Sequence, residues 1–214
     1  MRTNIGRRSI CGSLVGLGII SSREIWGEPK VLPYCRFSLV DGWADDGPSE
    51  YITHKAGAGD RSGVPQVVKR IGIALSIDAN FDLYIAKDED NAFATVANGR
   101  KILVVDVGFL EKLNRQSGTE WGAIQVIAHE VGHHIAGFVA DRHRSELNAD
   151  YWSGQSLQRL GAAKTAATRA ILAVGTEVDT ASHPNKYRRA AMIERGWKDA
   201  VDGKIDYSFC DGCR

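Results

Sequence analysis

The chain has 214 residues, of which 43% are hydrophobic and 25% are charged, a balance that suits one globular domain with a hydrophobic core. Its 27 basic residues nearly cancel its 26 acidic residues, so no positive surplus favours nucleic acid as a partner. The sequence contains no run of about 18 apolar residues, and we therefore expect no membrane span.

Residues 1–22 have the three regions of an export signal. Three arginines form a positive start, an apolar stretch runs from Ile10 to Ile20, and Ser21-Ser22 offers a cleavage site. The pair Arg7-Arg8 resembles a twin-arginine signal, and a Sec route is the alternative. We expect a periplasmic or secreted protein, which an uncleaved signal would tether weakly to the membrane. An ordinary flexible N-terminus is the competing interpretation.

Export permits disulfides, and Cys35, Cys210 and Cys213 lie beyond the signal. A bond from Cys35 to either of the other two would connect the ends of the domain, while the Cys-x-x-Cys spacing also fits a redox or metal site. Residues 23–61 are rich in Gly, Pro and Asp without sustained periodicity. We expect an irregular segment there, followed by one domain over residues 62–214.

The domain is predicted to begin with a helix and a hairpin. A proline in the first turn and apolar residues at helical spacing predict a helix from about Val64 to Leu75. Residues 81–86, 91–96 and 102–105 are predicted as strands, and Asn98-Gly99 joins the last two as a hairpin.

The next predicted helix carries the sequence His-Glu-Val-Gly-His at residues 129–133. Ser117 and Glu120 have the spacing of a capping box before it, and apolar residues recur at helical spacing along it. Two histidines four residues apart lie on one helix face and can share a metal ion. Zinc bound in this way activates a water molecule, and Glu130 is placed to accept its proton.

Glu146 is the best candidate for a third ligand. If the chain reverses near residue 140 and returns as an antiparallel helix, Glu146 lies level with His133. Asp150 then lies level with His129 and can orient that ring through the nitrogen that faces away from the metal. His143 is the rival ligand, but it would lie about 4.5 Å off the level of His133.

Two more helices are predicted downstream of the site. An alanine-rich helix runs over residues 163–174, and Ser182-His183-Pro184 begins a helix that continues to Arg195 and ends at Gly196.

A His-Glu-x-x-His helix followed by a Glu-x-x-Ala-Asp helix resembles the gluzincin metallopeptidases. More narrowly, the chain resembles the family of the heat-shock membrane protease and the CAAX prenyl protease, with its small soluble single-domain relatives. Asn91-Ala92-Phe93-Ala94-Thr95 resembles the edge-strand signature of that family, and His183-Pro184 with Arg189 resembles its later signature. The resemblance covers about residues 62–196, and the chain departs from it in the short spacing between His133 and Glu146.

The resemblance implies an α+β fold with a zincin-like core, in which a small, mainly antiparallel sheet lies beside an active-site helix and an antiparallel ligand-bearing helix. It implies one Zn²⁺ ion per chain on His129, His133 and Glu146, with Glu130 as general base and Asp150 behind the ligands. It also implies that Arg189 or His183 stabilises the negative oxygen of the intermediate and that Asn91, Ala92, Phe93 and Ala94 pair with the substrate backbone. The alternatives are that Arg189 pairs with an acid elsewhere and that residues 91–94 form an ordinary edge hairpin.

These expectations describe a zinc-dependent metalloendopeptidase that hydrolyses exported or envelope proteins, with a protein or peptide as its partner. The alternative is a catalytically inactive, zinc-stabilised binding protein on a metallopeptidase scaffold. Retention of Glu130 favours the enzyme, because a purely structural zinc site fills its fourth position with a protein ligand.

Overall fold

The computed structural model describes residues 35–38, 52–57, 59–97 and 99–210. These residues form an α+β fold, as predicted. The strands are β1 (Cys35–Ser38), β2 (Ile52–Lys55), β3 (Asp82–Ala86), β4 (Asn91–Ala97) and β5 (Arg100–Asp106). The helices are α2 (Val64–Leu75), α3 (Val107–Ser117), α4 (Trp121–Ala136), α5 (Arg142–Arg159), α6 (Lys164–Val174), α7 (Lys186–Val201) and the short 3-10 helix η1 (Tyr207–Phe209).

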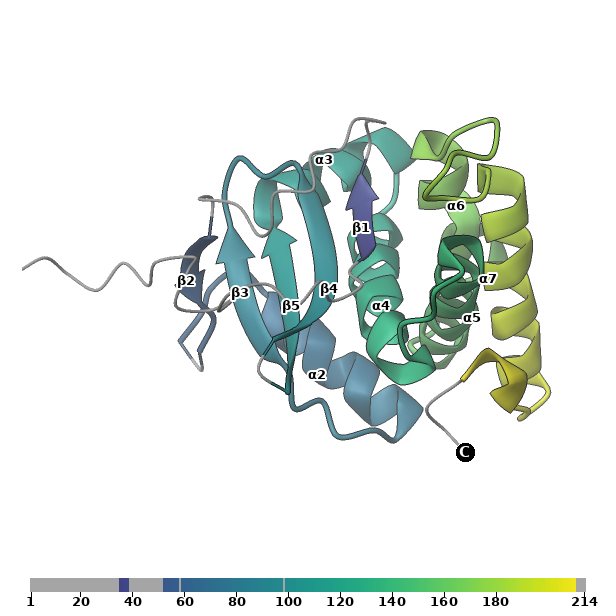
Figure 1. Cartoon of the computed structure of the whole chain (residues 1–214), viewed down its shortest axis with the longest axis horizontal. Coiled ribbons are helices and arrows are strands. Elements are labelled where there is room, and N and C mark those ends of the chain that lie inside the picture. Colours follow the sequence, from purple (N-terminus) through teal and green to yellow (C-terminus); the bar gives the residue numbers. More distant parts are fainter. Residues whose placement is uncertain (1–34, 39–51, 58, 98, 211–214) are drawn as a thin grey trace, which may run out of the picture.

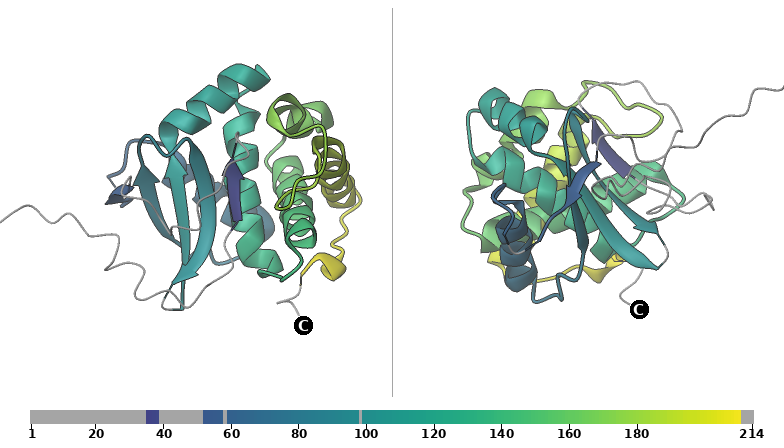
Figure 2. Two further views of the ribbon diagram at one scale, coloured as in Figure 1. Left: turned by 45° about the horizontal axis from the view of Figure 1, so that its top comes forward. Right: turned by 90° about the vertical axis from the view of Figure 1, so that its left-hand side faces the viewer.

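Helix α4 lies between the sheet and helices α5, α6 and α7. Figure 1 shows the strands on one side of α4 and helices α5, α6 and α7 on the other, and the left view of Figure 2 keeps this order. Buried side chains of α2, β5, α3 and α4 share one hydrophobic core, which includes Ile71, Leu103, Leu113 and Ile127. Within the described part of the chain, no helix is long and apolar enough to cross a membrane.

The five-stranded sheet is mixed, with the order β1-β4-β5-β3-β2. β3 and β5 are parallel, whereas the other three neighbouring pairs are antiparallel. The three strands predicted from the sequence are all present. The predicted export signal, residues 1–22, lies outside the described residues, and so does most of the segment 23–61.

Two short parts of the segment 23–61, which we predicted to be irregular, form the edge strands β1 and β2. β1 pairs antiparallel with β4, so that Cys35 lies opposite Ala94 and Ser38 lies opposite Asn91. The expectation that residues 91–96 form an edge strand is therefore wrong, because β4 has neighbours on both sides. Each edge strand has only four residues, too few for a periodic pattern to show in the sequence.

The start of α4 also differs from the prediction. Ser117 is the last residue of α3, and Gly118 follows it in the left-handed conformation, so Ser117 and Glu120 do not form a capping box. Thr119 accepts a hydrogen bond from the Trp121 N–H instead, and the side chain of Asn114 accepts one from the Ala123 N–H. A preceding helix thus supplies part of the cap.

The contact between α5 and α7 depends on two glycines. A Cβ atom on Gly154 would lie 2.1 Å from the Ile193 carbonyl oxygen, and one on Gly196 would lie 2.0 Å from the Tyr151 carbonyl oxygen. Gly196 therefore lies inside α7 and does not end it, contrary to the prediction. Likewise, α7 begins after Asn185, whose side chain accepts hydrogen bonds from two backbone N–H groups, and not at Ser182.

We expect the Gly196→Ala substitution to lower the free energy of unfolding by about 2–3 kcal/mol, because overpacking would push α7 away from α5. The control is Gly57→Ala, since an added Cβ there meets nothing within 4 Å. Urea denaturation of both variants checks this. Equal midpoints for the two variants would show that the helices do not touch at Gly196.

Candidate metal centre

Helices α4 and α5 run antiparallel and lie very close together. His129 contacts Asp150, and four residues later His133 contacts Ser145. Between these contacts, a Cβ atom on Gly132 would lie 2.7 Å from the Ala149 carbonyl oxygen, so the approach requires glycine on α4. The antiparallel return predicted from the sequence is confirmed, and it directs side chains of both helices to one point.

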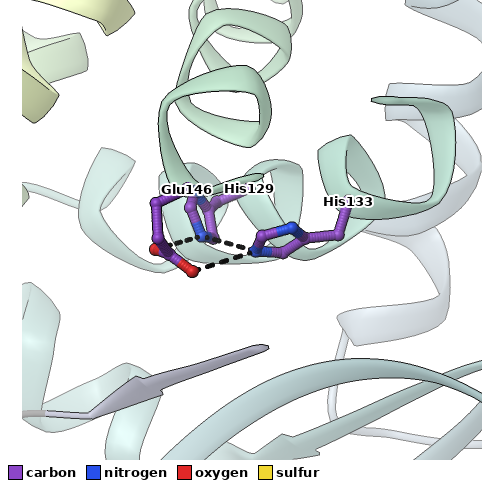
Figure 3. A group of neighbouring side chains, drawn as sticks. All are labelled: His129, His133 and Glu146. Atoms are coloured by element: carbon purple, nitrogen blue, oxygen red, sulfur yellow. Dashed lines mark hydrogen bonds and ion pairs between the residues drawn. The ribbon is translucent and has the colours of Figure 1, made fainter. Parts of the chain in front are cut away.

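The three predicted ligands meet at this point. The Nε2 atoms of His129 and His133 are 3.1 Å apart, and Glu146 places Oε2 3.4 Å from the first and Oε1 3.5 Å from the second. All three side chains are buried, and they form a group that could hold a metal ion. Figure 3 shows the two imidazoles and the carboxylate converging.

The spacing of these atoms fits a single cation. In a tetrahedral zinc site with ligand distances of about 2.0–2.1 Å, the donor atoms lie about 3.3 Å from one another. The three separations of 3.1, 3.4 and 3.5 Å lie close to that value. Two imidazoles with one carboxylate are also a donor set that zinc and other first-row divalent ions bind.

The orientation of the His129 ring supports the same conclusion. His129 Nδ1 lies 2.9 Å from Asp150 Oδ1, and a proton on Nδ1 would be donated to this carboxylate. The Nε2 atom of a neutral ring then presents its lone pair to His133 and Glu146. Electron-rich atoms this close repel one another unless a cation or a proton lies among them.

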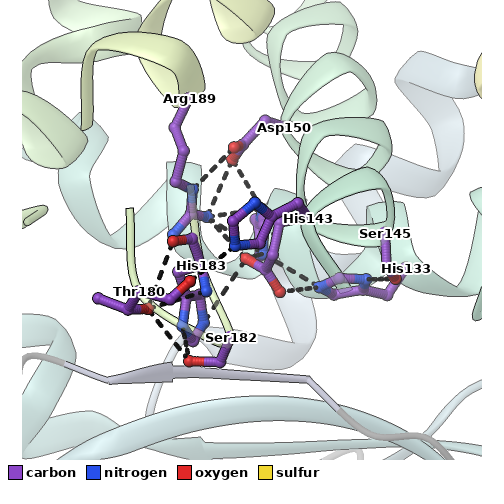
Figure 4. A network of polar contacts seen from close by, with 10 residues as sticks. His133, His143, Ser145, Asp150, Thr180, Ser182, His183 and Arg189 are labelled. Carbon is purple, nitrogen blue, oxygen red and sulfur yellow. Dashed lines mark hydrogen bonds and ion pairs between the residues drawn. The ribbon is translucent and has the colours of Figure 1, made fainter. Parts of the chain in front are cut away.

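Asp150 lies where it was predicted, behind His129, and Arg189 holds it there. The Arg189 guanidinium donates from Nε to Asp150 Oδ2 over 2.8 Å and from Nη2 to Oδ1 over 3.0 Å. The same Nη2 lies 3.2 Å from Glu146 Oε2, and the Arg189 side chain is buried. Figure 4 shows Arg189 reaching Asp150 from α7. Arg189 therefore lies beside the ligand group and pairs with two of its carboxylates, so the alternative of an acid elsewhere is wrong.

His183 lies on the more exposed side of the group. Its Nε2 is 3.7 Å from Glu146 Oε2, and its Nδ1 is 2.7 Å from the Ser182 hydroxyl. The side chain of His183 retains 15% of its exposure, whereas Glu146 has none. The loop before α7 thus brings a second predicted residue next to the ligands (Figure 4).

The charges of the site are set by burial and by Arg189. Burial raises the pKa of Glu146, but the Arg189 guanidinium and the two histidines outweigh this and hold it well below its usual value. Burial also lowers the pKa of His129, but Asp150 and Glu146 outweigh it and raise the pKa to about 9. Without a metal, a proton on His129 offsets the negative charge of the Glu146 and Asp150 carboxylates. Binding of a cation would release this proton.

Glu130 is fully buried on α4, next to His129. Burial raises its pKa to about 8, with the Glu146 carboxylate adding to the rise and His129 and Arg189 opposing it. A nearby divalent cation would favour the carboxylate form. Glu130 therefore combines a shifted pKa with a buried position next to one of the histidines of the ligand group.

The other two histidines near the site do not join the ligands. His134 stacks on Phe81 with a centroid distance of 5.3 Å, and its Nε2 lies 2.9 Å from the Ile102 carbonyl oxygen. The Nε2 of His143 lies 2.7 Å from the Thr180 carbonyl oxygen. Of the two candidates for the third ligand, the structure places Glu146, and not His143, with the two histidines.

We expect His134 to make the fold sensitive to acid. Burial lowers its pKa to about 4, below the value of 6.5 for an exposed histidine. As the pH falls from about 6.5 to 4, the unfolded chain takes up a proton that the folded chain does not, so stability falls by at most about 3 kcal/mol. In His134→Gln this loss should be absent, and exposed His54→Gln serves as control. Urea unfolding at pH 7 and pH 5 tests this, and identical pH dependence in all three proteins would contradict it.

One contact of this region was not predicted. Ser145 lies 3.5 Å from the Nδ1 of His133, and the antiparallel register that located Asp150 could have located Ser145 as well.

Cys210 is buried and disulfide-bonded, in agreement with an expected disulfide. Cys213 and the side chain of Cys35 lie outside the described residues, and the predicted pairing stays a prediction.

The arrangement joins two chemical capacities. Three buried side chains can bind a divalent cation, and the buried carboxylate of Glu130 beside them can accept and release a proton. His183 and Arg189 add polar groups on the remaining sides.

Comparisons of the chain with protein-family models, with curated proteins and with solved structures each find no match.

Proposed function

We propose that the chain is a zinc-dependent metalloendopeptidase with a zincin-like core, of the gluzincin type that its sequence resembles. The observation that carries this proposal is that His129, His133 and Glu146 lie within contact distance of one another. Glu130 is buried on α4, the helix of the two histidines. A zinc ion held there would activate water and polarise the scissile carbonyl.

Other residues of the site have separate roles in this proposed reaction. Glu130 accepts the proton of the attacking water and passes it to the leaving amine. Asp150, held by Arg189, fixes the orientation of His129. Because Arg189 is buried against two carboxylates, we assign stabilisation of the developing negative oxygen to His183, which is the more exposed of the two.

Metal removal tests this function. We would measure zinc in the purified chain and its hydrolysis of casein, then remove the metal with a chelator and restore it. Activity should disappear with the metal and return with zinc. A chain that contains one zinc ion and cleaves no unfolded protein would contradict the proposal.

One observation favours the alternative, an inactive binding protein that zinc stabilises. If His183 Nε2, 3.7 Å from Glu146, turned onto the metal, four protein ligands would close the site. Cobalt substitution distinguishes the enzyme from the binding protein. The cobalt absorption spectrum of a His183→Gln variant should equal that of the wild type if solvent completes the site, and should differ from it if His183 is a ligand.

We also propose that residues 1–22 direct export, since they combine a positive start with an apolar stretch and a cleavage site. The substrates would then be exported or envelope proteins. Cell fractionation of the full-length chain and of an Arg7→Lys/Arg8→Lys variant checks this. Equal distribution of both proteins would contradict twin-arginine export.

A further inference from the structure

Strand β1 occupies the position on the sheet that a peptide substrate would need. It pairs antiparallel with residues 91–94 of β4, the segment that resembles a substrate-binding strand. β1 is the outermost strand at this end of the sheet and contacts α4, which carries the two histidines. Figures 3 and 4 both show the purple strand passing beside the ligand group.

The pairing also lies beside the helix that carries the catalytic carboxylate. β4, whose residue Ala94 lies opposite Cys35, itself contacts α4, the helix of Glu130. A strand on this edge of β4 is therefore next to the helix that would supply the proton acceptor. An extended peptide gains affinity from main-chain hydrogen bonds to a sheet edge, and one edge accepts one strand.

We propose that β1 is an internal occupant of the peptide-binding edge of β4, so that the chain is self-inhibited until an extended peptide replaces β1 in the same antiparallel direction. Self-inhibition rests on the proposed peptidase function. The occupancy of the β4 edge by β1 can be measured without catalysis. β1 has only four residues, so its pairing is short enough for a longer peptide to displace.

A pair of proline substitutions removes β1 without touching the site. In an antiparallel pair, alternate residues direct their N–H groups to the partner strand, so one of two consecutive positions donates to β4. The Arg36→Pro/Phe37→Pro variant therefore disrupts the pairing in either register. His54→Pro in β2, on the opposite edge of the sheet, is the matched control.

The probe is a fluorescent peptide that copies residues 33–40 with Cys35→Ser, and the host is zinc-loaded Glu130→Gln protein, which binds without cleaving. We expect the double proline variant to bind this probe at least tenfold more tightly than its parent, and the His54→Pro variant to bind it as its parent does. Equal affinity in the double variant and its parent would overturn the proposal.

Hydrogen exchange on the chain without proline substitutions covers the case in which the double variant fails to fold. Saturating probe should speed exchange at residues 35–38 and leave residues 91–97 protected, because the probe takes the place of β1. Unchanged exchange at residues 35–38 would overturn the proposal.

Casein hydrolysis in the chain that retains Glu130 then distinguishes failure of self-inhibition from failure of the peptidase function. If the double variant cleaves casein at least tenfold faster, self-inhibition is supported. If the probe binds as expected and neither chain cleaves, the occupancy stands and the peptidase function falls. If both cleave equally, the peptidase function stands and self-inhibition falls.

Discussion

Replacing Glu130 with glutamine should lower casein hydrolysis by at least about 1000-fold while zinc stays bound. Glutamine has nearly the shape of glutamate, so the buried position on α4 can accept it, but its amide cannot accept a proton from water. The three ligand side chains are unchanged, and zinc content should equal that of the wild type.

Glu120→Gln is the matched control, because Glu120 is exposed at the start of the same helix. This variant should keep full turnover. Single-turnover hydrolysis and zinc analysis of both variants give the result. Wild-type turnover in Glu130→Gln would remove the proposed general base, and loss of zinc would mean that the variant reports on binding instead of proton transfer.

Replacing Glu146 with glutamine should weaken zinc binding by more than 100-fold. The carboxylate supplies the only negative charge among the three ligands, and its oxygens face both imidazoles at 3.4 and 3.5 Å. Residues behind metal ligands typically contribute 10- to 100-fold to affinity, and a direct ligand should contribute more. Competition with a chromophoric chelator measures the change.

Glu194→Gln provides the comparison for this second variant. Glu194 forms an exposed ion pair with Lys164, away from the ligand group, so its loss should leave zinc affinity unchanged. Asp150→Asn should fall between the two, because Asp150 orients His129 without contributing a donor atom to the group. Equal affinity in Glu146→Gln and Glu194→Gln would exclude Glu146 as a ligand.

The ligand group could be predicted from the sequence because its geometry is local. The spacing within residues 129–133 follows from one helix, and Glu146 and Asp150 follow from one reversal of the chain at the same rise per residue. Gly132 and Ala149 are small where the two helices meet, so a close antiparallel return was consistent with every residue involved.

Contacts between distant segments could not be predicted in this way. β1 meets β4 across more than fifty residues, and its four residues carry no pattern that names their partner. Gly196 looked like a helix end because glycine often stops a helix, whereas here it lets α7 approach the Tyr151 backbone. Helix α3 could have been found, since Asp106 precedes Phe109, Leu110 and Leu113 at helical spacing and caps the helix.

X-ray absorption at the zinc edge of the purified, metal-loaded chain tests the central claim most directly. We predict nitrogen and oxygen donors at about 2.0–2.1 Å, with imidazole scattering from two histidines and one carboxylate donor that disappears in Glu146→Gln. A sulfur donor at about 2.3 Å, or a spectrum that does not change when Glu146 is replaced, would place the metal elsewhere in the chain.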